Sequence, residues 1–433
     1  MNYERRLRVQ RSWFRLRPTV AMTRIRRTRL AEQAHFGSEV PMAASRVSRR
    51  GFVGGVATAL GAIGLAPQRE LWARSRGVAG AIPFPLSGPE EEYDGFAKLA
   101  NNENPYGPPD SVMKAMTRAM KYANRYGYPD GGIVDEIATH HGVKPENVLL
   151  AAGSGEILDV CGTTFLQNDR VLLGADPSYN IFYAHATALK ADIIKVPLLP
   201  DFRQDIPTTI LAARRNARDV GLVYLCNPNN PTGRLVTKDE VRQLLDGIPE
   251  DIPVLIDEAY HHFVDDPSYA TSVPYVLEGR QVIVARTFSK IAALAGMRLG
   301  YALAPKSLIQ RMHPYSVGSI SAVVKYGGVA ALRDTESQAW VKKVTIELRQ
   351  KTMKDLAALG YESVPSDTNF FMVNLKRPVV PVIDEFKKKG VLVGRPFPPL
   401  NEHLRVSIGT ADEMNRFVLA FRDIITQRTA KSG

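Results

Sequence analysis

The chain has 433 residues, of which 45% are hydrophobic and 23% are charged. These proportions are typical of a globular protein and exclude a disordered, collagen-like or integral membrane chain, while the length favours two domains over one. With only Cys161 and Cys226, the chain has neither a disulfide-rich scaffold nor a four-cysteine zinc site. The eight histidines show no metal-site spacing, so we expect no metal.

The formal net charge of +12 is concentrated at the N-terminus. Residues 1–50 contain thirteen arginines, no lysine and three acidic residues, which gives +10, whereas the rest of the chain carries only +2. A protein that binds phosphate backbones is expected to be basic over its folded body. The nearly neutral body therefore argues against nucleic acid as a partner.

A basic pair followed by an uncharged run lies at 46–66. The run of fifteen residues is too short and too rich in glycine and alanine to span a membrane. The segment resembles a twin-arginine export signal, S-R-R-x-F, through Ser48, Arg49, Arg50 and Phe52.

This resemblance implies that residues 1–80 are a leader that engages the twin-arginine export machinery. The protein would then be periplasmic or exported, and it would be cytoplasmic if the leader does not function. Cleavage is expected after a small residue within 66–80. Translation from Met42 is an alternative start that would leave 1–41 outside the protein.

From about residue 95, short apolar runs alternate with segments of helical periodicity. This alternation is typical of a mainly parallel sheet covered by helices on both faces, and we place the large domain of this α/β fold at residues 121–305. The predicted strands are 147–151, 170–174, 191–196, 220–225, 253–257, 281–285 and 299–304. The predicted helices between them include 156–166, 179–189 and 239–245.

After Pro305 the pattern changes. A long helical region is predicted over 306–359 with an interruption near 314–319, and a final helix over 412–427. Strands are predicted near 369–374, 391–394 and 403–408. We expect a smaller α+β domain at 306–433, to which residues 81–120 contribute an N-terminal arm and part of the fold.

Two neighbouring strand ends carry polar residues where buried strands should have none. Asp257 ends one apolar run, and a buried carboxylate is costly unless a positive group pairs with it. The next run is followed by Thr287, Ser289, Lys290 and Arg298. Two hydroxyls and an arginine suit a phosphate dianion, and a lysine among them could form a Schiff base with a carbonyl cofactor. Taken singly, Asp257 could be a helix N-cap and Lys290 could be a surface charge. Their joint occurrence favours a functional role for both residues.

Four motifs, in order, resemble those of the fold-type I pyridoxal-phosphate (PLP) aminotransferases of the class I/II group. They are N-P-N-N-P-T-G at 227–233, D-E-A-Y at 257–260, S-K at 289–290 with Arg298 eight residues on, and L-R-V-S-I-G-T at 404–410. The resemblance covers roughly residues 95–425. It implies a PLP-transferase fold with a large domain, whose mainly parallel seven-stranded sheet lies between helices, and a smaller α+β domain.

Within this group, three further segments look most like the histidinol-phosphate aminotransferase branch. They are N-E-N-P-Y-G-P at 102–108, Y-P-D at 128–130 and H-P-Y at 313–315. One segment departs from that branch, since G-S-G-E at 153–156 stands where G-A-D-E is common. The backbone role of this turn is unaffected by the difference.

The resemblance implies roles for residues around the cofactor ring. Lys290 would hold the Schiff base and move the proton at the substrate α-carbon, and Asp257 would pair with the pyridine nitrogen. Asn230 and Tyr260 would hydrogen-bond the phenolic oxygen of the ring, with Lys290, Asp257 and Tyr260 as the catalytic set. Tyr179 would lie against the ring face, although it could equally be a packed core aromatic.

The phosphate of the cofactor would be held from several sides. Ser154 and Gly155 open a helix after a strand, where backbone N–H groups and the helix dipole suit an anion. Thr287, Ser289 and Arg298 would add side-chain contacts. Tyr128 would reach the phosphate from the neighbouring subunit, which implies a homodimer with shared active sites.

Substrate contacts are implied for three residues. Arg405 would bind the substrate carboxylate, or the phosphate of histidinol phosphate, through a bidentate contact. Asn104 and Tyr106 lie in an arm that would cover the substrate.

We therefore expect a PLP-dependent aminotransferase that moves an amino group from an amino donor to a 2-oxo acid by a ping-pong mechanism. A lyase, decarboxylase or racemase of the same fold would use identical cofactor contacts and stays an alternative. A non-catalytic PLP-binding module is a further alternative, but such modules usually follow an N-terminal DNA-binding domain, and residues 1–80 contain an export-like leader instead. The identity of the donor and acceptor is left open.

Overall fold

The computed structural model describes residues 90–429, so the expected leader lies outside the described residues. The strands are β1 (Ala97–Leu99), β2 (Val148–Ala151), β3 (Val171–Asp176), β4 (Ile193–Pro197), β5 (Val220–Cys226), β6 (Val254–Asp257), β7 (Val282–Thr287), β8 (Gly300–Leu303), β9 (Ser363–Val364), β10 (Phe370–Asn374), β11 (Val391–Val393) and β12 (His403–Ser407). The α-helices are α3 (Glu90–Asp94), α4 (Asp110–Ala119), α5 (Ile133–His141), α6 (Ser154–Phe165), α7 (Asn180–Ala188), α8 (Ile206–Arg215), α9 (Lys238–Gly247), α10 (Val273–Leu277), α11 (Lys306–Met312), α12 (Ala322–Arg333), α13 (Thr335–Ala357), α14 (Val379–Lys388) and α15 (Ala411–Thr429).

The large sheet confirms the predicted α/β fold. Its seven strands have the order β2-β8-β7-β6-β5-β3-β4. β8 runs antiparallel to both β2 and β7, and all the other neighbouring pairs are parallel. All seven predicted strands are present within about two residues of their expected ends. The three predicted helices are α6, α7 and α9.

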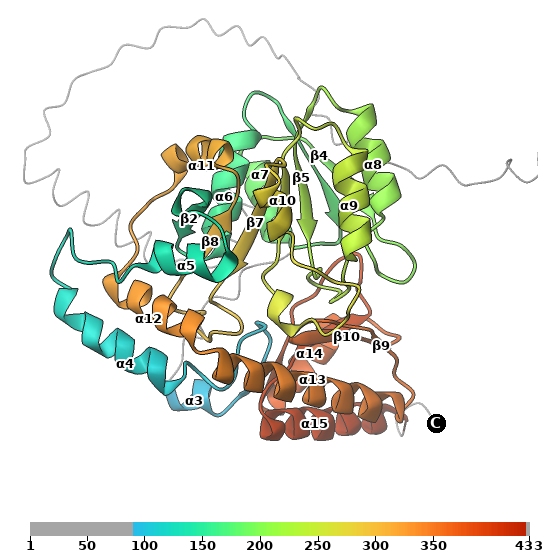
Figure 1. The fold of residues 1–433 in the computed structure, drawn as a ribbon. Helices are drawn as coiled ribbons and strands as arrows, with labels where there is room; N and C mark the ends of the chain where they lie inside the picture. Colours follow the sequence, from blue (N-terminus) through green and yellow to red (C-terminus); the bar gives the residue numbers. More distant parts are fainter. Residues whose placement is uncertain (1–89, 430–433) are drawn as a thin grey trace, which may run out of the picture. The chain divides into compact units, whose positions relative to one another are not determined.

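Helices cover both faces of this sheet because its central strands bury both of their faces. Every residue of β5 is buried, and successive side chains enter different hydrophobic clusters. Val223 and Leu225 pack in the cluster formed with α5, α8, α9 and α10. Leu222, Tyr224 and Cys226 pack in the cluster formed with α6, α7 and α11. In Figure 1, α8 and α9 accordingly lie on one side of the strands and α6 on the other.

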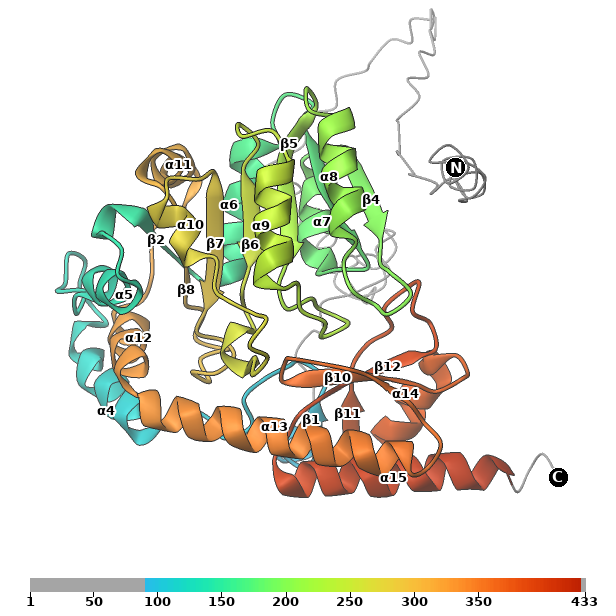
Figure 2. The same ribbon diagram turned by 45° about the vertical axis from the view of Figure 1, so that its right-hand side comes forward.

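A smaller α+β part has its own core. The antiparallel sheet β12-β10-β9 and the parallel pair β1-β11 carry its strands. Their apolar faces pack against α14, α15 and the C-terminal half of α13 around three phenylalanines, of which Phe386 and Phe417 are stacked and Phe421 is tilted against them. In Figure 2 the long helix α13 runs along these elements beside α15. The pairing of β1 with β11 brings residues 97–99 into this part.

Two segments pack differently from expectation. Helices α11 and α12, expected in the smaller domain, pack on α6 and on α4 and α5 respectively, beside the large sheet. Helix α12 can pack this closely because of its glycine pair. A Cβ at Gly327 would collide with Met116 of α4, and a Cβ at Gly328 would collide with Leu299. Two residues without side chains let the helices approach closely. Helix α4 therefore packs beside α12 and not in the smaller α+β part.

No helix among residues 90–429 is long and apolar enough to cross a membrane. The same residues contain no cluster of three or more histidine, cysteine or acidic side chains suited to a metal ion.

Candidate active site

The candidate site lies at the carboxyl ends of the parallel strands. These ends meet at one edge of a parallel sheet, which is where ligands bind in open α/β sheets. β6 ends at Asp257 and β7 at Thr287, while the loops after β5, β3 and β2 carry Asn230, Tyr179 and Ser154. The topology thus gathers five predicted residues that are up to 133 positions apart in the sequence.

Lys290 and Asp257 lie close enough to influence each other's protonation. β6 and β7 are adjacent and parallel, with Asp257 opposite Ala285, so both chain segments leave the sheet side by side. The Lys290 ammonium lowers the pKa of Asp257, and Asp257 raises that of Lys290. Burial, with the nearby Arg405 guanidinium, outweighs this attraction and lowers the pKa of Lys290 to about 8. A substantial fraction of this amine is therefore neutral near physiological pH.

Asp257 is buried and receives two neutral donors. The Tyr224 hydroxyl donates to its Oδ2 over 3.3 Å, and the Ala259 amide to its Oδ1 over 3.2 Å. Burial raises the pKa of Asp257 to about 6 against the opposing effect of these two bonds. Tyr224 was missed at the sequence level; a tyrosine within a fully buried strand is the signal, because its hydroxyl needs a partner there.

Tyr260, Asn230 and Arg405 form a connected chain of hydrogen bonds. The Asn230 amide donates to the Tyr260 hydroxyl over 3.3 Å, and Arg405 donates to the Asn230 carbonyl oxygen over 2.9 Å. The Lys290 nitrogen lies 5.6 Å from the centre of the Tyr260 ring. Burial raises the pKa of Tyr260, so the phenol stays protonated at neutral pH. The structure thus brings these predicted residues together with Lys290.

Beside Lys290, hydroxyls and a guanidinium surround the start of α6. The Arg298 guanidinium donates to Ser289 Oγ over 3.2 Å, and the Thr287 hydroxyl donates to the same oxygen over 2.9 Å. Arg298 lies directly against Gly153, where any Cβ would collide with it. The first-turn N–H groups of α6, from Ser154 onward, have no partner within the helix. Together these donors form a cradle suited to an anion, and phosphate binding there stays a prediction.

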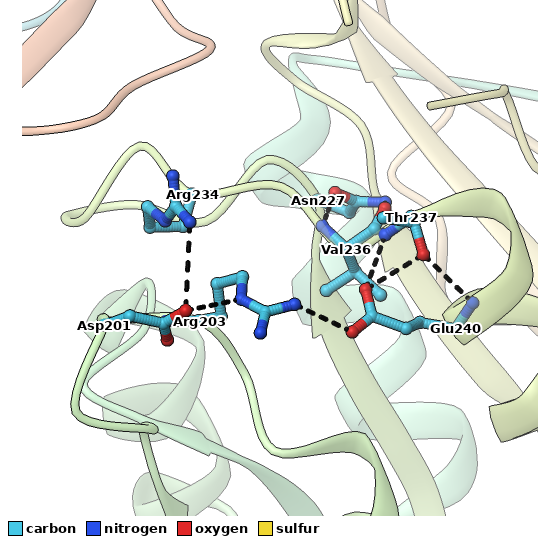
Figure 3. A network of polar contacts seen from close by, with 7 residues as sticks. All are labelled: Asp201, Arg203, Asn227, Arg234, Val236, Thr237 and Glu240. Carbon is cyan, nitrogen blue, oxygen red and sulfur yellow. Dashed lines mark hydrogen bonds and ion pairs between the residues drawn. The ribbon is translucent and has the colours of Figure 1, made fainter. Parts of the chain in front are cut away.

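A polar network holds the loop that carries Asn230 (Figure 3). The Asn227 side chain closes the loop by two 2.9 Å bonds to the backbone of Val236. Thr237 and Glu240 then form a capping box at the start of α9. Arg203 bonds to Glu240 over 3.1 Å and to Asp201 over 2.7 Å. The loop 227–236 is therefore fixed at both ends by side-chain hydrogen bonds.

Behind the site, a buried ion pair links the two strand ends. Glu258 follows Asp257 and Arg286 precedes Thr287, so both point to the opposite face of the sheet. Arg286 Nη2 lies 2.6 Å from Glu258 Oε2, and both side chains are almost fully buried. Glu258 also accepts a 2.7 Å bond from the Ser272 amide. Because losing one partner would leave a buried charge, this pair holds β6 and β7 in register at the site.

Two arginines meet around Phe397 without an acidic partner among residues 90–429. The guanidinium of Arg395 lies 4.3 Å from the Phe397 ring centre and that of Arg405 lies 4.5 Å from it. Burial lowers the pKa of both, but arginine keeps its charge at neutral pH. Arg405 Nε is buried and has no hydrogen-bond partner. The sequence does not predict Arg395 as a site residue, because the surrounding G-R-P at 394–396 matches none of the family motifs.

Three consecutive residues of the N-terminal segment face the site. Arg405 donates to the Ala100 carbonyl over 2.6 Å, and Lys290 donates to the Asn101 carbonyl over 3.2 Å. The Asn102 amide donates to the Tyr260 hydroxyl over 3.0 Å. Asn102 was also missed: it belongs to the segment 102–108, but nothing local distinguishes it from the other polar residues there.

Four predicted residues lie at or beyond the edge of this group. Tyr179, at the start of α7, is largely buried; burial raises its pKa to about 12, and Asp257 adds to the rise. Asn104 and Tyr106 line a pocket of about 310 Å³ together with Ile291, Ala292, Trp340 and Val341. Tyr128 donates to the Ile320 carbonyl. The partner-subunit role of Tyr128 stays a prediction.

The residues present fit a bound PLP molecule. Asp257 is a buried carboxylate in need of a cation, the cradle around Arg298 suits a phosphate dianion, and Lys290 offers a nitrogen of lowered pKa. Tyr260 and Asn230 supply hydrogen-bonding groups between these two ends. Each polar feature of the site thus has a counterpart in the cofactor, although the individual roles stay predictions.

Comparison with known proteins agrees with this fit. The family model described as aminotransferase class I and II matches residues 95–421. Histidinol-phosphate aminotransferase of Moorella thermoacetica is 34% identical over 338 residues, which cover 76% of this chain and 85% of that protein. Histidinol-phosphate aminotransferase 2 of Carboxydothermus hydrogenoformans is 33% identical over 331 residues, which cover 74% and 89%. The crystal structure of histidinol-phosphate aminotransferase from Sinorhizobium meliloti in complex with pyridoxal-5′-phosphate superposes with a TM-score of 0.72 at 25% identity, covering 80% of this chain and 96% of that one.

The Tyr224 bond yields a prediction about pH. The affinity of the cofactor-free protein for added PLP should fall as the pH drops through about 6. Below that pH, Asp257 becomes protonated and no longer pairs with the pyridinium. Tyr224→Phe removes a bond to the charged form, so it should raise the pKa of Asp257 and move this fall upward by about one pH unit. The measurement is the PLP dissociation constant between pH 5 and 9.

Tyr183→Phe is the matched control, since its buried hydroxyl bonds to the Ala175 carbonyl instead of a site carboxylate. Identical pH dependence in wild type and Tyr224→Phe would contradict the prediction.

Proposed function

The chain belongs to the class I and II aminotransferase family, and we propose that its amino donor is an amine bearing a phosphate or carboxylate group, with histidinol phosphate as the first candidate. The protein is a PLP-dependent transaminase. When bound, PLP supplies an aldehyde that condenses with amines and a ring that withdraws electrons from the adjoining carbon. The observation that supports the anionic donor is the pair formed by the buried Arg405 and the half-buried Arg395, which have no acidic partner in residues 90–429.

The residues around Lys290 are arranged to move a proton. With a pKa near 8, the Lys290 nitrogen can both accept and release a proton at neutral pH, as general acid–base catalysis requires. Asp257 holds positive charge at the pyridine end, and its burial strengthens that attraction. The Arg298 cradle fixes the phosphate end, so the reacting carbon is held within reach of Lys290.

Lys290→Ala should abolish transamination. Loss of the proton-transferring group typically costs 10²–10⁴-fold, and here the same residue also provides the covalent attachment, so turnover should fall by about 10³-fold or more. The measurements are turnover with a donor screen and the absorption spectrum of the bound cofactor. Full turnover and an unchanged spectrum in this variant would contradict the assignment of Lys290.

The arginine pair predicts how the donor is recognised. A phosphate dianion can accept bonds from both guanidiniums, whereas a carboxylate carries a single charge. Arg395→Met should therefore raise KM for histidinol phosphate by about 10- to 100-fold with little change in kcat, since a bond to a charged group contributes about 1.5–3 kcal/mol.

Arg280→Met is the control for this substitution, because Arg280 pairs with Asp246 on the surface of the large domain. An unchanged KM for histidinol phosphate in Arg395→Met would count against a phosphate-bearing donor. A donor screen in which only carboxylate-bearing amines react would do the same.

We also propose that the enzyme is a homodimer with shared active sites. Tyr128 donates to the Ile320 carbonyl, and the nearby Met113, Met120 and Tyr126 expose 47%, 57% and essentially all of their surface. Exposed apolar patches of this kind often mark interfaces. Light scattering should give the mass of two chains, and Met113→Glu/Met120→Glu should give one; a monomeric wild-type protein at all concentrations would refute the dimer.

Export is proposed on the sequence alone. The segment S-R-R-x-F at 48–52 supports passage through the twin-arginine machinery, with the mature protein periplasmic. Replacing Arg49 and Arg50 by lysine should retain the protein in the cytoplasm, whereas Arg46→Lys should not. Cell fractionation checks this, and equal export of all three forms would disprove the signal.

A further inference from the structure

Asn102 lies where three parts of the fold meet at the site. Its amide nitrogen Nδ2 donates to the Tyr260 hydroxyl over 3.0 Å, and its Oδ1 accepts from the Ser407 hydroxyl over 2.9 Å. Its backbone N–H donates to Ser407 Oγ over 2.8 Å, and its carbonyl accepts from Asn369 over 3.0 Å. The side chain is 1% exposed. Asn102 thus joins Tyr260 to the strand that carries Arg405.

The hydrogen bonds to Ser407 fix which end of the Asn102 amide faces Tyr260. Ser407 Oγ accepts from the Asn102 backbone N–H and donates its own proton to Oδ1. With Oδ1 engaged by Ser407, the NH₂ group points at Tyr260. In this orientation the Asn102 side chain donates a hydrogen bond to Tyr260 and does not accept one.

The Tyr260 oxygen consequently accepts from two amides, those of Asn102 and Asn230. A phenol has two lone pairs and one proton, so its acceptor capacity is used and its proton must go to another group. The Lys290 nitrogen lies over the Tyr260 ring, 5.6 Å from its centre. The remaining acceptor on this side is the ring oxygen of the cofactor that Tyr260 is proposed to contact.

We propose that Asn102 is a positioning residue that forces Tyr260 to donate its proton to the phenolic oxygen of bound PLP, with Ser407 holding the Asn102 amide in the required orientation. The inference rests on the proposed contact between Tyr260 and that oxygen. A hydrogen bond donated to the phenolic oxygen of PLP stabilises the negative charge on that oxygen. The stabilisation is strongest in the deprotonated form, in which no proton lies between this oxygen and the Lys290 nitrogen. Asn102 therefore lowers the pH at which the absorption of the bound cofactor changes.

Asn102→Gly tests the side chain alone. Asn102 has a φ of 55°, in the left-handed region that glycine adopts freely, so the backbone bonds to Ser407 and Asn369 can persist. The midpoint pH of the cofactor spectrum should rise by about one unit, the shift that corresponds to one lost hydrogen bond. Asn168→Gly is the matched control: Asn168 has a φ of 58° in an exposed loop, and its replacement should leave the midpoint unchanged.

Ser407→Ala is the second variant, and it carries the test if Asn102→Gly does not fold. It frees the Asn102 amide to turn its carbonyl toward Tyr260, so the midpoint should rise in the same direction by a smaller amount. Thermal unfolding of the cofactor-free proteins is measured in parallel. A lowered unfolding temperature with an unchanged midpoint in both variants would mean a purely structural role and would overturn the proposal.

A double-mutant cycle with Tyr260→Phe identifies the route of the effect. The shift caused by Asn102→Gly should vanish in the Tyr260→Phe background, because the hydroxyl through which it acts is absent. A shift that persists there would overturn the inference while leaving the role of Tyr260 intact. If Tyr260→Phe alone leaves the midpoint unchanged, the proposed contact of Tyr260 with the cofactor fails first, and the inference with it.

Discussion

The burial of one carboxylate is the constraint on which the rest of the site depends. Asp257 ends a strand whose residues are all buried, and the donors that reach it within residues 90–429 are a hydroxyl and a backbone amide. Neutral donors only partly offset the cost of a buried charge, and the raised pKa of Asp257 expresses that deficit. A cationic ligand removes it. The predicted pairing of Asp257 with the pyridinium of PLP would remove this deficit and so favour cofactor retention.

The groups that face the cofactor and those that face the substrate come from different parts of the fold. The predicted cofactor contacts lie at strand ends of the large sheet, and the loop that carries Asn230 is fixed by the network around Asn227. Arg405 lies on β12 of the smaller antiparallel sheet, and Arg395 on the loop that follows β11. A rigid cofactor site and a separately built anion site suit a family whose chemistry is constant while its donors differ.

Much of this arrangement could be predicted from the sequence because its signals are local. Asp257 and Lys290 are polar residues at the ends of apolar runs, and such exceptions can be seen without knowing the fold. The seven strands were predictable for the same reason, as continuous apolar runs. Asn102 could not be predicted, because its partners Tyr260 and Ser407 are 158 and 305 positions away. The placement of α12 was missed because periodicity indicates a helix but not the surface it packs on.

The segment Ala100–Asn102 connects the two halves of the site. Its successive residues bond to Arg405, the predicted substrate contact, to Lys290, the predicted Schiff-base lysine, and to Tyr260, the predicted contact of the cofactor ring. An anionic substrate that binds Arg405 competes with the Ala100 carbonyl for the same guanidinium. The two peptide units between Ala100 and Asn102 are thus a short covalent path between the proposed substrate contact, Arg405, and the proposed cofactor contact, Tyr260.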